Sequence, residues 1–162
     1  SLNLNDRSWV IHTRSEERPP VMIENGSTIR DSLITDGSVI CEGAIVERSV
    51  LSPGVYVGPN AVIRESVILT DTYIEAGAVV ERCVIDKQVV VGHDVQVGKI
   101  TESGDLGITV IGKGAHIPAG FTIGRNVVIG TDLGPDDFAE FPEKSVPNGK
   151  KVMGDSKKRA EY

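Results

Sequence analysis

The amino-acid sequence predicts an all-β fold, a parallel β-helix with triangular coils, because its aliphatic residues repeat with a period of seventeen. One set of repeating positions comprises Ile29, Val46, Ile63 and Val80. A second set comprises Ile34, Leu51, Ile68 and Ile85, and a third comprises Ile40, Val57, Ile74 and Val91. Successive positions lie five or six residues apart. This spacing predicts three short strands in every coil of a solenoid.

Two columns of charged residues support the same coil length. The columns are Arg30, Glu47, Arg64, Glu81 and Asp31, Arg48, Glu65, Arg82. Both alternate in sign, so stacking the coils about 4.8 Å apart places each charge next to an opposite one. Exposed pairs contribute only about 0–1 kcal/mol each, but a shift of one coil would bring like charges together, so the columns specify the register. A charged binding face is the alternative, and it is disfavoured because neither column has a single sign.

Composition limits the class of protein. The chain has 162 residues, 40% hydrophobic and 4% aromatic, which suits a single domain with a narrow core of Val, Ile and Ala. No apolar segment is long enough to span a membrane, the N-terminus lacks a signal-peptide pattern, and the net charge of −6 disfavours nucleic acid as a partner. We therefore expect a cytoplasmic protein without nucleic-acid or membrane partners, in which Cys41 and Cys83 are reduced.

The repeat divides the chain into three regions. Residues 1–24 lack the repeat and contain the tryptophan. Residues 25–130 form the predicted β-helix, whose period fails between residues 99 and 109, so a loop insertion is expected there. Residues 131–162 are predicted to form a C-terminal cap and tail, because the last coil of a solenoid exposes strand edges that need covering.

Patterns typical of catalysis are absent from the sequence. No Gly-rich phosphate loop, nucleophile elbow or zinc-ligand spacing occurs, and the positions of His12, His93 and His116 do not suit a three-histidine metal site. We therefore expect neither catalytic residues nor a metal site in this chain. A lone His93 or His116 could serve as the general base of a hexapeptide acyltransferase, although a surface histidine is the simpler interpretation.

Two predicted corners carry lysines. Lys87 lies two residues after the inward aliphatic residue at position 85 and is preceded by Asp86. Lys113 likewise lies two residues after the inward aliphatic residue at position 111. If the insertion bulges outward, these corners lie on adjacent coils, about 5 Å apart along the axis. Lysines at neighbouring corners can form an anion site, whereas isolated, solvated lysines are the simpler explanation.

Several segments resemble one enzyme family, ADP-glucose pyrophosphorylase (glucose-1-phosphate adenylyltransferase). Residues 4–14 (Leu-Asn-Asp-Arg-Ser-Trp-Val-Ile-His-Thr-Arg), followed by Arg-Pro-Pro at 18–20, are similar to the linker that joins the catalytic domain to a C-terminal left-handed β-helix. The coil motifs at residues 32–34, 49–55, 84–87, 107–111 and 117–120 are also similar to those of the family. The resemblance covers residues 4 to about 130, and it implies a left-handed hexapeptide-repeat β-helix.

The resemblance also implies a function. The family transfers adenylyl from ATP to glucose 1-phosphate, giving ADP-glucose and pyrophosphate, with magnesium bound in an N-terminal catalytic domain that is missing here. This chain would then be the C-terminal regulatory and oligomerisation domain of such an enzyme, inactive alone and tetrameric in the full enzyme. Asp86, Lys87 and Lys113 match positions that take part in binding a phosphorylated effector in plant-type members. The insertion is shorter than in many members and the segment after residue 130 departs from the pattern, so the identity of the effector stays open.

Other functions remain open at this point. One alternative is a hexapeptide-repeat acyltransferase that uses coenzyme A and a histidine base. Another is a non-enzymatic scaffold, and a third is a nucleotidyltransferase for another sugar phosphate. The linker motif disfavours this last alternative, but the pockets for the nucleotide and the sugar are not in this chain.

Overall fold

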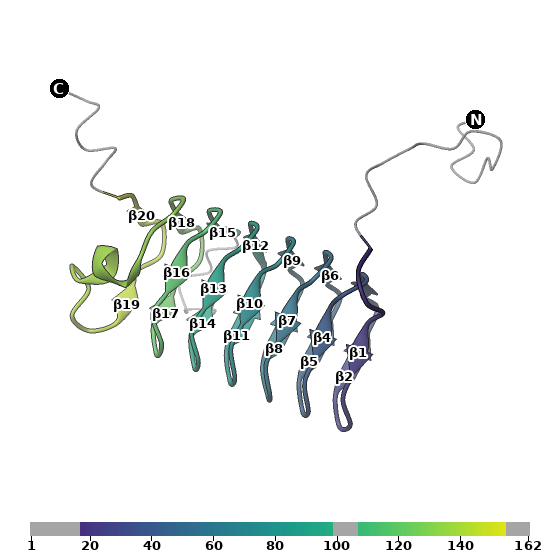
Figure 1. The fold of residues 1–162 in the computed structure, drawn as a ribbon. Helices are drawn as coiled ribbons and strands as arrows, with labels where there is room; N and C mark the ends of the chain where they lie inside the picture. The colour runs from purple at the N-terminus through teal and green to yellow at the C-terminus, as the bar shows by residue number, and fades with distance from the viewer. Residues whose placement is uncertain (1–16, 99–106, 155–162) are drawn as a thin grey trace, which may run out of the picture.

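The computed structural model describes residues 17–98 and 107–154, which form a left-handed parallel β-helix (Figure 1). Its short strands stack into three parallel sheets, one along each side of a triangular coil. This arrangement confirms the predicted fold class. No helix in the described residues is long and apolar enough to cross a bilayer.

We call the three sheets side A, side B and side C. Side A consists of β1 (Met22–Ile23), β4 (Val39–Ile40), β7 (Tyr56–Val57), β10 (Tyr73–Ile74), β13 (Val90–Val91) and β16 (His116–Ile117). Side B consists of β2 (Thr28–Arg30), β5 (Ile45–Glu47), β8 (Val62–Arg64), β11 (Val79–Glu81), β14 (Gln96–Val97), β17 (Thr122–Ile123) and β19 (Ser145–Val146). Side C consists of β3 (Leu33–Ile34), β6 (Val50–Leu51), β9 (Val67–Ile68), β12 (Cys83–Ile85), β15 (Thr109–Ile111), β18 (Val128–Ile129) and β20 (Lys151–Val152).

The core is a column of aliphatic side chains on the solenoid axis. Side chains alternate across a strand, so in β7 Val57 points inward and is fully buried, whereas Tyr56 faces outward. The register pairs Val57 with Ile40 on one side and with Ile74 on the other. Buried residues therefore stack on equivalent residues in neighbouring coils, as the seventeen-residue period predicts.

A hydroxyl ladder holds the corner between sides B and C. The Ser49 hydroxyl donates to the carbonyl of Glu47 at 2.7 Å and accepts the N–H of Ser66 at 3.1 Å. Cys83 occupies the same position in the next coil, where its thiol contacts the carbonyl of Glu81 at 2.9 Å. Burial raises the pKa of the Cys83 thiol to about 12. Both Cys83 and Cys41 are buried free thiols.

The predicted charge columns form ion pairs between coils. Arg64 bridges the coils before and after it, with Nε 3.2 Å from Glu47 Oε2 and Nη1 3.1 Å from Glu81 Oε1. In the second column Glu65 accepts from both neighbours, at 3.1 Å from Arg48 and 2.7 Å from Arg82. The structure thus confirms oppositely charged neighbours for seven of the eight charges, whereas Asp31 forms no ion pair with Arg48 among the described residues.

The period is interrupted where the insertion was expected. Ile85 pairs with Ile111, a separation of 26 residues instead of 17, so this coil contains nine additional residues. Thr109, assigned to the insertion from the sequence, is already the first residue of β15.

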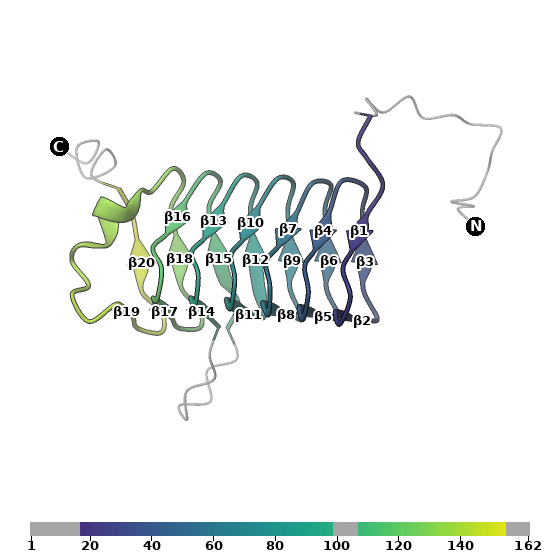
Figure 2. The same ribbon diagram turned by 60° about the horizontal axis from the view of Figure 1, so that its bottom comes forward.

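The C-terminal end combines strands with a short helix (Figure 2). Strands β19 and β20 continue sides B and C as far as Val152. On side A the 3₁₀ helix η1 (Pro135–Phe138) takes the place of a strand next to β16. Paired strands therefore also occur within residues 131–162, predicted as cap and tail, and β1 lies within residues 1–24, predicted as a linker.

Candidate effector site

The corner between sides C and A carries the predicted site residues. Asp86 and Lys87 directly follow β12, and Lys113 follows β15 after one glycine. Because Ile85 pairs with Ile111, Lys87 and Lys113 occupy equivalent places on adjacent coils. The N–H of Gly114 donates to the carbonyl of Lys87 at 3.0 Å, which links the two corners directly. The structure therefore brings the two lysines together, as the sequence predicts.

The side chains of Lys87 and Lys113 are both exposed to solvent. Asp86 is half-buried, and its carboxylate accepts the backbone N–H of Lys87 at 2.7 Å. Its carbonyl accepts the Thr72 hydroxyl at 2.7 Å. Among the described residues, no carboxylate lies within ion-pair distance of Lys87 or Lys113. Asp86 thus orders the turn, and the two positive charges remain available for an anion.

The same corner holds an arginine from the segment that enters the β-helix. Arg18 Nη1 lies 2.6 Å from Asp71 Oδ1, and Nη2 lies 3.2 Å from Oδ2, so the pair is bidentate. The hydrogen bonds from Arg18 lower the pKa of the Asp71 carboxyl below its usual value. Asp71 lies one coil before the coil of Lys87, because the N–H of Gln88 donates to the carbonyl of Thr70 at 3.0 Å. The entering segment is therefore attached beside the candidate site.

Two glycines make room for this arginine. A Cβ added to Gly37 would lie 3.3 Å from Cβ and Cδ of Arg18, and one added to Gly54 would collide with Arg18 Nη1 and with Asp71 Oδ1. Both glycines also have positive φ, 75° and 74°, a conformation that residues with a side chain rarely adopt. This contact was not predicted from the sequence, although Gly37, Gly54 and Asp71 occur seventeen residues apart at the same corner.

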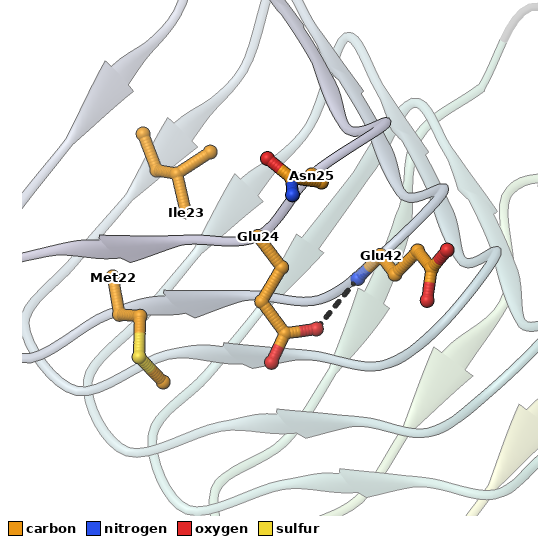
Figure 3. Close-up of a pocket in the computed structure, with 5 residues that line it drawn as sticks. All are labelled: Met22, Ile23, Glu24, Asn25 and Glu42. Atoms are coloured by element: carbon orange, nitrogen blue, oxygen red, sulfur yellow. Dashed lines mark hydrogen bonds between the residues drawn. The ribbon is translucent and has the colours of Figure 1, made fainter.

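A separate hollow lies at the N-terminal end of the β-helix (Figure 3). It has a volume of about 440 Å³ and is lined by Met22, Ile23, Glu24, Asn25 and Glu42. The Glu24 carboxylate accepts the backbone N–H of Glu42 at 2.8 Å, as the dashed line in Figure 3 shows. A neighbouring, more apolar hollow of about 530 Å³ is lined by residues 19–23, Gly37 and Val39. The described residues contain no group of three His, Cys, Asp or Glu that could hold a metal ion.

The two histidines that the structure describes, His93 and His116, lie at exposed positions. His93 occupies the corner between β13 and β14, with Nδ1 3.2 Å from Asp94 Oδ2 and its backbone N–H 2.8 Å from a Glu75 carboxylate oxygen. His116 faces outward from β16. His12 lies outside the described residues. Neither of these two histidines lines either of the hollows described above.

Comparison with known proteins identifies relatives of the whole repeat. The family described as GlmU-like, C-terminal hexapeptide matches residues 21–108. The glucose-1-phosphate adenylyltransferase of Thermomicrobium roseum is 46% identical over 93% of this chain and 36% of its own length. The enzyme of the same name from Thermosipho africanus is 49% identical over 81% of this chain and 33% of its own length. The chain thus spans about a third of the length of these relatives.

A solved structure shows the same fold at low sequence identity. A protein assigned as an acetyltransferase of Desulfovibrio desulfuricans G20 superposes with a TM-score of 0.58 at 15% identity, covering 66% of this chain and 22% of its own. This likeness concerns the fold alone. The match over residues 21–108, more than half of the sequence, shows that the chain belongs to the GlmU-like C-terminal hexapeptide family.

Proposed function

We propose that this chain is the C-terminal regulatory and oligomerisation domain of a glucose-1-phosphate adenylyltransferase, an enzyme of glycogen or starch synthesis. The observation that carries the proposal is the 46% identity to an enzyme of that name over 93% of this chain but only 36% of the relative. In this proposal, transfer of the adenylyl group and binding of its magnesium ion take place in the remaining two-thirds of the enzyme. Its full assembly is a homo-oligomer, expected to be a tetramer.

The regulatory role is assigned to Asp86, Lys87 and Lys113. Two ammonium groups on adjacent coils, about 4.8 Å apart along the axis, repel each other unless an anion lies between them. A phosphorylated effector supplies such an anion and accepts charge-assisted hydrogen bonds from both lysines. Asp86 keeps Lys87 in place by closing the turn, because its carboxylate binds the N–H of that residue.

The proposal predicts weaker activation when either lysine is removed from the full-length enzyme. A hydrogen bond to a charged group contributes about 1.5–3 kcal/mol when partly buried. Because both lysines are solvent-exposed, we expect Lys87→Ala or Lys113→Ala to raise the activator concentration for half-maximal activation by about threefold to tenfold. Activation curves with a set of sugar phosphates measure the shift.

The matched control is Lys151→Ala, which removes an exposed lysine from β20, far along the chain from the corner. Its activation curve should equal that of the parent enzyme. Unchanged curves for Lys87→Ala and Lys113→Ala would show that these residues are ordinary surface lysines. This 162-residue chain, assayed alone with ATP and glucose 1-phosphate, is expected to release pyrophosphate only at the background rate.

A further inference from the structure

Side C carries most of the large apolar side chains that the described part of the chain exposes. Its equivalent outward positions hold the following exposed apolar residues from β3 to β18: Leu33, Val50, Val67, Val110 and Val128. Lys151 takes this position in β20, and the exposed Met153 follows directly after the strand. Leu33 is 69% exposed. Val84, which is half-buried, completes the row between Val67 and Val110. The equivalent outward positions of side B, from Thr28 to Thr122, include no exposed large apolar residue. A continuous apolar row with polar flanks is typical of a surface that contacts another protein.

The flank of this row identifies its partner. Asp31, Arg48, Glu65 and Arg82 immediately precede the corner residues that lead into β3, β6, β9 and β12. Their charges alternate along the axis as minus, plus, minus, plus. In a second copy that runs in the opposite direction, the same column is plus, minus, plus, minus. Each charge of one copy then lies opposite a charge of the other sign in the second copy. This column is therefore complementary to an antiparallel copy of itself.

We infer that side C from β3 to β12 binds a second copy of this chain, antiparallel and related by a two-fold axis between β6 and β9. This arrangement places Asp31 opposite Arg82 of the second copy, and Arg48 opposite its Glu65. A shift of one coil would bring like charges together and is disfavoured. An interface of this kind uses the same surface patch on both copies. The inference specifies the surface for the oligomerisation role proposed above, and it rests on that role.

The apolar row fits the same arrangement. In this register Leu33 lies opposite Val84 of the second copy, and Val50 lies opposite its Val67. Strands β3, β6, β9 and β12 pair in unbroken register, so the row is continuous within these four coils. Four coils spaced about 4.8 Å apart provide less contact than the about 800 Å² per partner of a standard interface. We therefore expect weak association that depends on protein concentration.

The first test places a charge on side C. Val67→Glu leaves a carboxylate without a partner in the apolar contact, so the dimer should dissociate at least about ten times more readily. Val62→Glu is the matched control, because Val62 faces outward from side B in the same coil. Sedimentation equilibrium from micromolar to submillimolar concentration measures association, and circular dichroism checks that both variants fold. Equal association of the two variants would overturn the assignment of side C.

The second test separates contacts between copies from contacts within one chain. In a dimer of the Arg48→Glu variant, the new carboxylate faces Glu65 of the other copy at both symmetric contacts. In a dimer of the Glu65→Arg variant, the new guanidinium faces Arg48 at both contacts. Each variant alone should therefore associate about tenfold more weakly. In an equal mixture every facing pair is again opposite, and heterodimers should recover the affinity of the parent chain. The Arg48–Glu65 pair within each chain, 3.1 Å apart, is broken in both variants whether or not they are mixed.

Glu47→Arg and Arg64→Glu serve as the control for mixing. Their side chains belong to β5 and β8 on side B, so mixing them should have no effect on association. A mixture of Arg48→Glu and Glu65→Arg that behaves as the average of its components would overturn the antiparallel register. A parent chain that stays monomeric at every concentration would overturn the oligomerisation role itself, whereas association that survives Val67→Glu would overturn only the choice of side C.

Discussion

The two ends of the β-helix differ in how their cores are covered. At the C-terminal end, Phe138 of η1 is buried and packs edge-on against Phe121, with ring centroids 5.4 Å apart and planes at 71°. At the N-terminal end, Ile23 in β1 is 54% exposed, although it pairs in register with the fully buried Ile40. The same residue type at the same place in the repeat is thus buried in one coil and exposed in the next.

This difference shows that burial in a solenoid depends on the number of neighbouring coils. Ile40 lies in β4, which pairs with β1 on one side and β7 on the other, whereas Ile23 lies in β1, which pairs only with β4 among the described strands. At the C-terminal end side A lacks a strand beyond β16, but η1 contacts β16 in its place and the Phe138 ring packs on Phe121. The repeat therefore determines which side chains point inward. In the terminal coils, the burial of these side chains also depends on whether another segment covers the end of the solenoid.

Removing the aromatic cover should have the largest effect. Phe138→Ala deletes a buried ring that no other described aromatic residue replaces, so the free energy of unfolding should fall by about 3–5 kcal/mol. Phe141→Ala, at a half-buried position nearby, should cost clearly less. Urea denaturation of both variants gives the two values, and hydrogen exchange in β16 to β18 shows whether the last coils open first. A loss of under about 1 kcal/mol for Phe138→Ala would mean that η1 does not cover the core.

A matched pair of isoleucines measures the contrast at the other end. Ile40→Ala leaves a cavity in the core and should cost about 2–5 kcal/mol. Ile23→Ala removes the same atoms from an exposed position, and should cost less than about 1 kcal/mol. Denaturation of the two variants under identical conditions compares them. Equal losses would show that Ile23 is covered in solution by a part of the protein beyond the described residues.

The smallest expected effect concerns the ion pair between Arg18 of the entering segment and Asp71. Arg18 lowers the pKa of Asp71 in the folded state, so the pair stabilises the fold above the unfolded pKa of about 3.9, and this contribution disappears as pH falls through the lowered folded value. Because the Asp71 side chain is 44% exposed, we expect less than about 1 kcal/mol at low salt.

Comparing the parent chain with Asp71→Asn across pH tests this prediction. The difference in free energy of unfolding should be present at neutral pH, shrink below about pH 4 and decrease with added salt. Asp36→Asn, at an exposed acidic position for which the structure records no ion pair among the described residues, is the matched control. A difference that is independent of pH would show that Asp71 acts through its hydrogen-bonding shape rather than its charge.

Most of the fold could be predicted because every regular coil repeats one set of interactions. The same seventeen-residue period appears in the inward aliphatic residues, the serine positions and the charge columns. Each of these patterns therefore predicts the same coil length independently. The C-terminal coil was harder to recognise, because 23 residues separate Ile123 from its partner Val146. The added residues lie between Ile129 and Val146, in the stretch that contains η1, whose burial depends on contacts outside the repeat.

The candidate site was predictable to the same extent. Lys87 and Lys113 were expected on adjacent coils because an outward insertion leaves the register of the following strand unchanged, and the pairing of Ile85 with Ile111 agrees. The position of Arg18 could not be predicted, because it contacts Asp71 across 53 residues from a segment without the repeat. Such a contact depends on the path of the entering chain and on the space above two glycines. The effector role of the lysines remains a prediction.

The alternating charge columns restrict how this β-helix can change in length. Deleting residues 49–65 would remove one complete coil and preserve every inward position, but it would place Glu47 beside Glu81 and Arg48 beside Arg82. Deleting residues 32–65 removes two coils and restores opposite neighbours, because Arg30 then meets Glu81 and Asp31 meets Arg82. The inward aliphatic positions repeat in every coil, so the core tolerates the removal of any number of coils. The surface charges repeat only every second coil, so removal of an odd number brings like charges together. Duplications and deletions that keep both intact must therefore proceed by pairs of coils, in steps of thirty-four residues.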